Sequence, residues 1–299
     1  PQQFRGGVGD SGGGFGMTTG LGPEDALVCH AARKLGRPVK WRAARSEEFL
    51  AAPMARDQHF KAQLALDAGG RILALKMECL GNFGSVPVGS SAIIPLVLGP
   101  KVQTTVYHVP VIDYHVRGVL THTMATGAYR GAGRPEANYL MERLIDKAAR
   151  EMKFDPIELR RRNLIQPGQY PYRTHLGETY DTGVFARMLE RVLEVADWKG
   201  FEARRGESKR RGKLRGRGLA VYIEWTGALP TETVDIRVDA DGTVTVFSGT
   251  QAMGQGLETS YAQLITEVLQ IPLGKVRIVQ GDTDQANGMG SVGSRSAFV

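Results

Sequence analysis

Apolar and polar residues alternate along two stretches of the chain, and a short polar turn separates them. The apolar positions are Phe60, Ala62, Leu64 and Leu66 before the turn, and Leu73, Leu75, Met77 and Cys79 after it. A period of two places these side chains on one face of each strand. The turn from Asp67 to Gly70 ends in two glycines, which permit a tight reversal. The pattern therefore predicts a β-hairpin over residues 60–79.

Four other stretches of the first 200 residues predict helices. Residues 23–35 begin with Pro23, carry acids first and bases last, and stop at Gly36. Residues 135–152 carry an apolar face made of Ala137, Leu140, Met141, Leu144 and Ala148. Asp155 is expected to cap a short helix over residues 157–163, and residues 184–196 predict another helix.

The last 80 residues repeat this mixture of strands and helices. Strands are predicted over residues 219–225, 232–238, 243–247 and 275–279, with a turn at residues 239–242. An amphipathic helix is expected before Pro272, with its buried face made of Leu257, Tyr261, Leu264, Ile265, Val268 and Leu269. A polar loop over residues 281–296 follows. Strands and helices that do not alternate strictly predict an α+β fold.

The positive charge of the chain lies in one segment. The 299 residues have a net charge of +7, and residues 204–217 alone hold eight Lys or Arg against Glu207. The remainder of the chain is therefore neutral. We interpret residues 201–217 as a basic linker, a solvated loop between a first domain over residues 1–200 and a second over residues 218–299. A nucleic-acid arm is the alternative, although no aromatic residue interleaves the bases.

Composition excludes several classes of protein. With 42% hydrophobic and 23% charged residues the chain can form a large core. Cys29 and Cys79 are too few for a disulfide scaffold, an iron–sulfur cluster or a four-thiolate zinc site, and we expect reduced thiols. The apolar run of residues 92–98 is too short for a membrane helix. The chain starts without methionine or a targeting signal and ends abruptly, so we expect a piece of a longer, cytoplasmic protein, and the family resemblance described below implies a bacterial one.

Three short motifs suggest functions that the surrounding sequence does not support. Residues 9–13 (GDSGG) match the sequence around a protease nucleophile, but only ten residues precede Ser11 and no strand is predicted there. Glycines 7, 9 and 12 match a dinucleotide fingerprint without the preceding strand. The histidines at 108, 115 and 122 are seven residues apart, which on strands points them to alternating faces, so we interpret them as scattered residues and not as metal ligands.

Four glycine-rich loops occur along the chain, and they are stronger evidence of function than these three motifs. They are residues 12–16 (GGGFG), 127–133 (GAYRGAG), 249–256 (GTQAMGQG) and 290–296 (GSVGSRS). Three of them run toward a predicted helix start, where free backbone N–H groups favour an anion. Each loop alone is also compatible with a tight turn. Together they predict a large polyanionic ligand held at several points.

These loops, together with residues 128–136 (AYRGAGRPE), 249–259 (GTQAMGQGLET) and 281–284 (GDTD), resemble the molybdopterin-binding large subunit of the xanthine dehydrogenase, aldehyde oxidase and aerobic carbon monoxide dehydrogenase family. The motifs occur in the family's order over nearly the whole chain. The resemblance implies two α+β molybdenum-cofactor-binding domains, both incomplete here, with the cofactor between them.

The resemblance also implies which residues contact the cofactor. Backbone contacts near the metal would come from the regions of Phe15, Arg130 and Gly293, with Arg130 adding electrostatic support. The metal itself would hang from the pterin. The implied cofactor-binding residues are Gly14, Phe15, Gly16, Ala128, Tyr129, Arg130, Met253, Gly254, Gln255, Gly256, Gly293, Ser294, Arg295 and Ser296. Gly131 and Ala132 would line the substrate channel.

The family's chemistry implies partners. A pterin cofactor that carries molybdenum would hydroxylate the substrate, with water as the oxygen source. In bacterial members this cofactor is molybdopterin cytosine dinucleotide. Electrons would pass to an iron–sulfur small subunit and an FAD-binding medium subunit, in a dimer of heterotrimers. The family's general-base glutamate and a metal-contacting glutamine lie in motifs that this chain lacks, and neither Glu258 nor Glu224 is assigned that role. We therefore expect the isolated chain to be inactive.

Departures from the family's motifs narrow the substrate. Gly131 stands where copper-containing carbon monoxide dehydrogenases have a cysteine, so carbon monoxide oxidation by that route is not expected. Ala132 replaces an aromatic residue and Thr19 an acidic one of purine-oxidising members. These differences favour an aldehyde or an N-heterocycle. The AYRGAGR stretch resembles instead the second, carbon monoxide dehydrogenase-like form of the family. The alternatives are a non-catalytic module that binds a nucleotide or nucleic acid, carbon monoxide oxidation without the copper-binding cysteine, and an orphan fragment without activity.

Overall fold

The computed structural model describes residues 5–227 and 231–298, which form two compact units. Unit 2 is residues 43–224, and unit 1 is made of residues 1–42 and 225–299. Each unit contains a small sheet and helices, so the α+β class is confirmed. These compact units do not follow the predicted domain division at residues 201–217, and that division stays a prediction about sequence domains.

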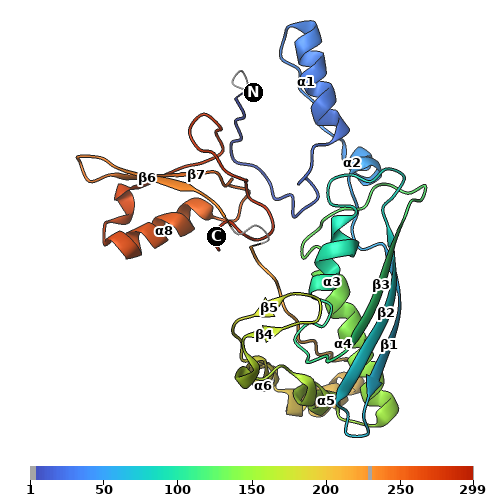
Figure 1. The fold of residues 1–299 in the computed structure, drawn as a ribbon. Coiled ribbons are helices and arrows are strands. Elements are labelled where there is room, and N and C mark those ends of the chain that lie inside the picture. Colours follow the sequence, from blue (N-terminus) through green and yellow to red (C-terminus); the bar gives the residue numbers. More distant parts are fainter. Residues whose placement is uncertain (1–4, 228–230, 299) are drawn as a thin grey trace. The chain divides into compact units, whose positions relative to one another are not determined.

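The sheet of unit 2 consists of β1 (Gln58–Leu66), β2 (Ile72–Asn82) and β3 (Ile112–Val119), which run side by side (Figure 1). β1 and β2 form the predicted hairpin, with Phe60 opposite Cys79. β3, which the sequence pattern did not indicate, pairs parallel to β2. A short two-stranded sheet of β4 (Tyr172–Arg173) and β5 (Thr179–Tyr180) completes the strands of unit 2 in the described residues.

Helices α4 (Arg134–Met152), α5 (Pro156–Asn163) and α6 (Phe185–Val195) contribute buried residues to the core that this sheet forms. Met141 and Ile145 of α4 join Leu75 and Met77 of β2 in one buried core. Asp155 caps α5 through its carboxylate, as predicted, by accepting from the Ile157 and Glu158 amides. The remaining helical elements are α2 (Arg45–Ala51), a π-helix (Ile94–Leu98) that continues into α3 (Gly99–Lys101), and 3-10 turns at Pro167–Gln169 and Trp198–Gly200.

A buried charged group lies inside the core of unit 2. The guanidinium of Arg160 is completely buried and donates to Glu142 at 2.7 and 3.0 Å and to Asp146 at 2.9 Å. Tyr107 donates its hydroxyl to the other carboxylate oxygen of Glu142. Arg160 also donates to the carbonyl of Leu219 at 3.2 Å. Because every partner is hydrogen-bonded, the group joins α4, α5 and the segment that follows residue 218.

Two predictions about residues 201–225 are wrong. Residues 201–210 form helix α7 (Phe201–Arg210) and not a solvated loop, because Phe201 is buried at its start and intrahelical pairs such as Arg205 with Glu202 support it. Residues 219–225 form no strand. They run extended without pairing to a strand. The side chains of Leu219, Val221 and Ile223 pack on the core of unit 2, and the Leu219 and Ile223 carbonyls accept hydrogen bonds from core side chains.

The sheet of unit 1 has the same plan as that of unit 2. β6 (Val234–Val238) and β7 (Val244–Ser248) form an antiparallel hairpin, and β8 (Val276–Val279) pairs parallel to β7. Helix α8 (Leu257–Leu269) lies between β7 and β8 in sequence and packs on β8, and a 3-10 turn follows it at Leu273–Lys275. Helix α1 (Pro23–Leu35) has the bounds and the left-handed Gly36 cap that the sequence predicted.

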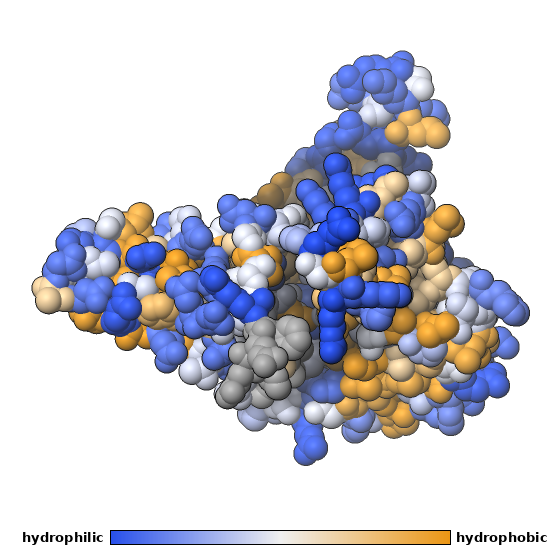
Figure 2. Space-filling view, turned by 90° about the horizontal axis from the view of Figure 1, so that it is seen from above, coloured by the Kyte–Doolittle hydropathy of each residue, from blue (hydrophilic) through white to orange (hydrophobic). Residues whose placement is uncertain are grey.

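The apolar face predicted for α8 is only partly buried. Leu257 is buried, but Leu264 is 52% exposed and Val268 76% exposed. Strand β6 is exposed along its length, because it is the edge of a three-stranded sheet. Figure 2 shows such apolar residues in orange among polar ones on the surface. Within the described part of the chain, none of the helices has the length and apolar character needed to cross a membrane.

Candidate functional site

The N-terminal glycine segment of unit 1 is bound to the GDTD turn. Arg5 donates to both carboxylate oxygens of Asp282, at 3.0 and 2.5 Å, and the amide of Gly6 donates to the Thr283 hydroxyl at 2.9 Å. The amide of Val8 donates to the carbonyl of Gly281 at 2.7 Å. The hydrogen bond from Arg5 is the main cause that holds the pKa of Asp282 well below its usual range. Two motifs 277 positions apart in sequence therefore form one strand-like pair.

A chain of hydroxyl and amide groups connects the other loops of unit 1. Gln251 donates its side-chain amide to Ser11 Oγ at 3.1 Å, and its backbone amide to Ser291 Oγ at 2.9 Å. Ser291 Oγ returns a bond to the Gln251 carbonyl at 3.1 Å and accepts one from Ser296 Oγ at 3.0 Å. Tyr261 of α8 donates to the Ser296 carbonyl. Three of the four predicted glycine loops thus meet in unit 1.

The loop of residues 249–256 presents glycine backbone to open space. Gly254 has φ 91° and Gly256 φ 76°, and a Cβ at either position would meet nothing within 4 Å. Gly256 is the N-cap of α8, so the free amides of that helix start at this loop. The Gln255 side chain is used internally, because it accepts from the Met253 amide at 2.5 Å and donates to the Gln251 carbonyl at 2.9 Å. Gln255 therefore shapes the loop.

The loop of residues 290–296 is held by a buried ion pair. Arg295 is 1% exposed and donates to Glu232 at 2.6 Å and to the Thr231 carbonyl at 2.6 Å. Burial raises the pKa of Glu232, but hydrogen bonds from the backbone amides of Thr233 and Met289 and from Arg295 outweigh burial, so the pKa lies below its ordinary value. The Arg295 guanidinium is thus committed to Glu232, and the loop's surface is formed by backbone at Gly293 (φ 62°) and Ser294 (φ 58°).

The GGGFG loop is a tight turn with one exposed aromatic residue. Phe15 has φ 50° and is 51% exposed, and Gly16 has φ 103°. The Met17 amide donates to the Gly14 carbonyl, and the Thr19 hydroxyl donates to the Gly16 carbonyl at 2.8 Å. A Cβ on Gly14 would lie 2.1 Å from Thr18 Oγ1. The close packing of the turn therefore requires glycine at position 14.

The fourth loop, residues 127–133, belongs to unit 2 and is held at its beginning by three neighbours. The Gly127 amide donates to the Met54 carbonyl at 2.8 Å, and the Ala128 amide donates to Ser90 Oγ at 2.7 Å. Arg56 donates to the Arg130 carbonyl at 2.5 Å, and its guanidinium lies over the Tyr129 ring, 5.5 Å from the centroid. These interactions therefore hold the backbone of residues 128–130, which are predicted to contact the cofactor.

The end of that loop has an unusual backbone. Gly131, Ala132 and Gly133 have φ of 95°, 41° and 92° in succession. A Cβ on Gly133 would lie 2.7 Å from the Gly99 amide nitrogen, so glycine is needed where α4 crosses α3. Ala132 is held in the left-handed region, where a residue with a Cβ is strained. The surrounding structure therefore holds Gly131 and Ala132, the two predicted channel residues, in a left-handed conformation.

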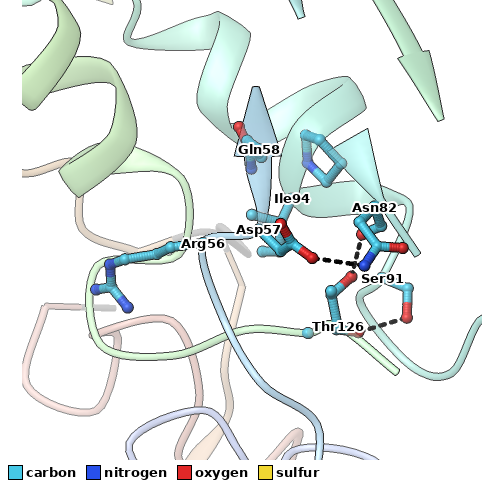
Figure 3. Close-up of a pocket in the computed structure, with 9 residues that line it drawn as sticks. Arg56, Asp57, Gln58, Asn82, Ser91, Ile94 and Thr126 are labelled. Carbon is cyan, nitrogen blue, oxygen red and sulfur yellow. Dashed lines mark hydrogen bonds between the residues drawn. The ribbon is translucent and has the colours of Figure 1, made fainter. Parts of the chain in front are cut away.

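A small polar pocket lies at the root of this loop, beside Gly127 (Figure 3). Asp57 accepts from the Asn82 side-chain amide at 2.6 Å, and the Thr126 carbonyl accepts from Ser91 at 2.5 Å. Figure 3 shows Arg56 pointing away from these groups. Because Asp57 and Asn82 bond to each other, the pocket serves to anchor the loop and offers little to a ligand.

Residues that support the predicted loops lie both outside and inside the motifs. Outside the motifs are Arg5, Arg56, Ser90 and Glu232, which the sequence did not indicate, whereas Ser11, Gln251 and Ser291 belong to the motifs. Ser11 and Gln251 are adjacent to or within the glycine loops, so their polarity was a usable signal. Glu232 and Arg56 had no signal in the sequence.

The available groups fit a polyanionic ligand. The loops contain backbone N–H groups, hydroxyls and the side chain of Arg130, and the open positive-φ glycines permit close approach. In the described residues, no group of three or more His, Cys, Asp or Glu side chains is placed to hold a metal ion.

Comparison with known proteins identifies both halves of the chain. Models of the molybdopterin cofactor-binding domain match residues 2–164 and residues 191–299. The chain is 32% identical to the nicotine 6-hydroxylase large subunit of Paenarthrobacter nicotinovorans and 34% identical to the carbon monoxide dehydrogenase large chain of Hydrogenophaga pseudoflava. Each match covers 97% of this chain, but only 37% and 38% of the respective relative.

Solved structures are similar over the same extent. Quinoline 2-oxidoreductase from Pseudomonas putida 86 matches with a TM-score of 0.92 and 36% identity, over 98% of this chain and 39% of that one. Carbon monoxide dehydrogenase from Oligotropha carboxidovorans matches with a TM-score of 0.90 and 32% identity, over 99% and 39%. The chain therefore spans less than half the length of the proteins that it resembles.

Proposed function

Because the chain belongs to the molybdopterin cofactor-binding family of molybdenum hydroxylase large subunits, we propose that its glycine loops hold a molybdenum-pterin cofactor in a complete oxidoreductase. The observation that carries the proposal is the loop of residues 249–256. Gly254 and Gly256 leave open space in front of the backbone at the point where α8 begins. An anionic pterin phosphate is suited to such a place.

The loops have distinct roles in binding this cofactor. The backbone amides of residues 254–256 and 293–294 bind the pterin and its phosphates, and the hydroxyl chain through Ser291 and Ser296 fixes these two loops to each other. Arg130 supplies positive charge beside the metal. Arg295 holds its loop in place from inside, since its guanidinium is bound to Glu232.

The cofactor, when bound, supplies oxidation of a carbon atom with oxygen from water. We propose an N-heterocycle as the substrate, with an aldehyde as the second candidate. Two similar proteins are named for nicotine and quinoline, both N-heterocycles, which supports this choice. Gly131 has no thiolate for copper, which argues against carbon monoxide oxidation by a copper route.

The complete enzyme that we propose includes subunits and segments beyond residues 1–299. A cytosine dinucleotide form of the cofactor, iron–sulfur and FAD-binding partner subunits, and a general-base glutamate outside this chain complete the enzyme. Similar proteins are named as the large chain or gamma subunit of complexes, which supports the need for partners. The isolated chain is accordingly expected not to turn over substrate.

The test uses three glycine substitutions in the complete protein. Gly254→Ala and Gly256→Ala place a methyl group in the proposed phosphate site, and Gly242→Ala is the matched control. Gly242 has φ 78° and equally open surroundings but lies in the β6–β7 turn. Backbone strain is therefore the same, about 1–2 kcal/mol, in all three variants.

Molybdenum and cytidine monophosphate released by acid are measured per large subunit. The wild type and Gly242→Ala are expected to contain both, and the other two variants at least fivefold less. A wild type without molybdenum, or full loading of Gly254→Ala and Gly256→Ala, would contradict the proposal.

A further inference from the structure

A buried arginine contacts the carbonyl groups of the predicted channel loop in unit 2. Arg134, at the start of α4, is 5% exposed. Its Nη1 donates to the Gly131 carbonyl at 3.1 Å and to the Ala132 carbonyl at 3.4 Å. Its backbone amide also donates to the Gly131 carbonyl at 3.0 Å. One residue thus holds two successive carbonyl groups of a loop in a strained conformation.

A carboxylate from a distant part of the chain faces the same arginine. Glu224 Oε1 lies 3.6 Å from Arg134 Nε, and the Glu224 side chain is 41% exposed. Glu224 stands at the end of the extended segment that packs on the core through Leu219, Val221 and Ile223. This segment is anchored by Arg160, which donates to the Leu219 carbonyl at 3.2 Å, and by Asn138, which donates to the Ile223 carbonyl at 3.4 Å.

The ion pair is buried on the side of Arg134, while the Glu224 carboxylate is half-exposed. Burial lowers the pKa of Arg134 and raises the pKa of Glu224, and in each case it outweighs the attraction between the two charges. Buried ion pairs contribute little to stability compared with apolar residues, and their best-attested use is to specify one arrangement. The pair specifies the conformation of Gly131 and Ala132, because Arg134 donates hydrogen bonds to the carbonyl groups of both residues.

We propose that Arg134 and Glu224 are positioning residues that fix the carbonyl groups of Gly131 and Ala132, and so set the shape of the substrate channel on that loop. Arg134 acts directly on the loop, and Glu224 acts through Arg134. The part about the channel rests on the proposed function. The part about loop order rests on the contacts alone.

The experiment compares four variants of the complete protein with its partner subunits. Arg134→Met removes the charge and the Nη1 donor, and Arg134→Lys keeps a charge without the planar guanidinium whose Nη1 reaches both carbonyls. Glu224→Gln removes only the partner charge. The control is Glu190→Gln, which breaks an exposed pair with Arg161 at 2.6 Å elsewhere in unit 2.

Hydrogen exchange of the loop amides is the first measurement. The Ala132 and Arg134 amides donate to the Tyr129 and Gly131 carbonyls, at 2.8 and 3.0 Å, so they report on the loop directly. We expect exchange about tenfold faster in Arg134→Met and at least threefold faster in Glu224→Gln. Arg134→Lys should lie between the wild type and Arg134→Met, and Glu190→Gln should stay within twofold of the wild type. If Arg134→Met does not fold, Glu224→Gln and Arg134→Lys decide.

Substrate preference is the second measurement. The ratio of kcat/KM for a bicyclic over a monocyclic N-heteroaromatic substrate should change at least fivefold in Arg134→Lys and Glu224→Gln, and should not change in the control. Unchanged exchange in both variants would overturn the positioning role. Faster exchange with an unchanged ratio would overturn the effect on the channel. A wild type without molybdenum would refute the proposed function, while the exchange rates would still decide the role of Arg134.

Discussion

Several polar residues in this chain stabilise a loop, while other residues of the same loop form its exposed backbone. Arg295 was predicted as a cofactor contact, but the structure shows its guanidinium inside unit 1, on Glu232. Gln255 likewise bonds within its own loop. A motif in sequence does not distinguish a side chain that faces a ligand from one that supports the loop, since both are polar.

Glu232→Gln tests the support of the loop of residues 290–296. Removing the carboxylate charge leaves Arg295 buried without a counter-ion, which is expected to destabilise the protein by about 3 kcal/mol at neutral pH. The pKa of Glu232 is lowered in the folded state, so its charge stabilises the fold above the ordinary glutamate pKa, and this contribution disappears as pH falls through the folded-state value. The difference between wild type and variant should therefore shrink in acid.

Calorimetric unfolding at neutral and at acidic pH measures both effects. Glu267→Gln, an exposed site on α8, serves as the control and should change stability by less than about 0.5 kcal/mol. Equal stability of Glu232→Gln and wild type at neutral pH would contradict the structural role assigned to the pair.

At the scale of elements, sequence periodicity predicted most helices and strands of the structure. The bounds of α1, the hairpin of β1 and β2, and the Asp155 cap follow from local signals that tertiary packing does not override. The prediction failed over residues 201–210 and 219–225. An arginine-rich stretch became helix α7 because Phe201 anchors it in a core that local patterns do not reveal. β3 was missed because its pairing with β2 is long-range.

Gly133→Ala tests the crossing of α3 and α4. A methyl group at this position would lie 2.7 Å from the Gly99 nitrogen and 2.9 Å from its Cα, in addition to the strain of a φ of 92°. We expect a loss of about 3 kcal/mol or more, since overpacking and backbone strain add. Gly242→Ala, with strain but no contact, should lose about 1–2 kcal/mol. Thermal unfolding measures both, and equal losses would show that the crossing tolerates a side chain.

At the scale of the whole molecule, the comparisons confirm the resemblance that the glycine loops indicated. The motifs indicated the ligand class because glycine loops at several helix starts are typical of sites that bind anions. They did not reveal how the chain is divided. Unit 1 takes residues from both ends of the chain, and no local composition marks residues 42 and 225 as boundaries.

The basic segment provides a test of the nucleic-acid alternative. Three arginines of this segment, Arg204, Arg205 and Arg211, form ion pairs with carboxylates nearby in sequence. The guanidinium of Arg217 lies over the rings of Trp198 and Phe201, 4.3 and 4.5 Å from their centroids. These contacts consume much of the charge that a nucleic acid would bind. We therefore expect the purified protein to retain no nucleic acid at about 0.15 M salt, measured by its ultraviolet absorbance ratio. Retention with a steep dependence on salt would favour the alternative.

The bond between Arg5 and Asp282 has a consequence for synthesis of the chain. It joins residues 277 positions apart, with the whole of unit 2 between them in sequence. Unit 2 is continuous in sequence, so it can fold on the ribosome as soon as residue 224 has emerged. Unit 1 must wait until its last strand and the GDTD turn are made, and until then its N-terminal glycine segment lacks the partner that Asp282 provides. The order of translation therefore places the pairing of the N-terminal glycine segment with the GDTD turn after the folding of unit 2.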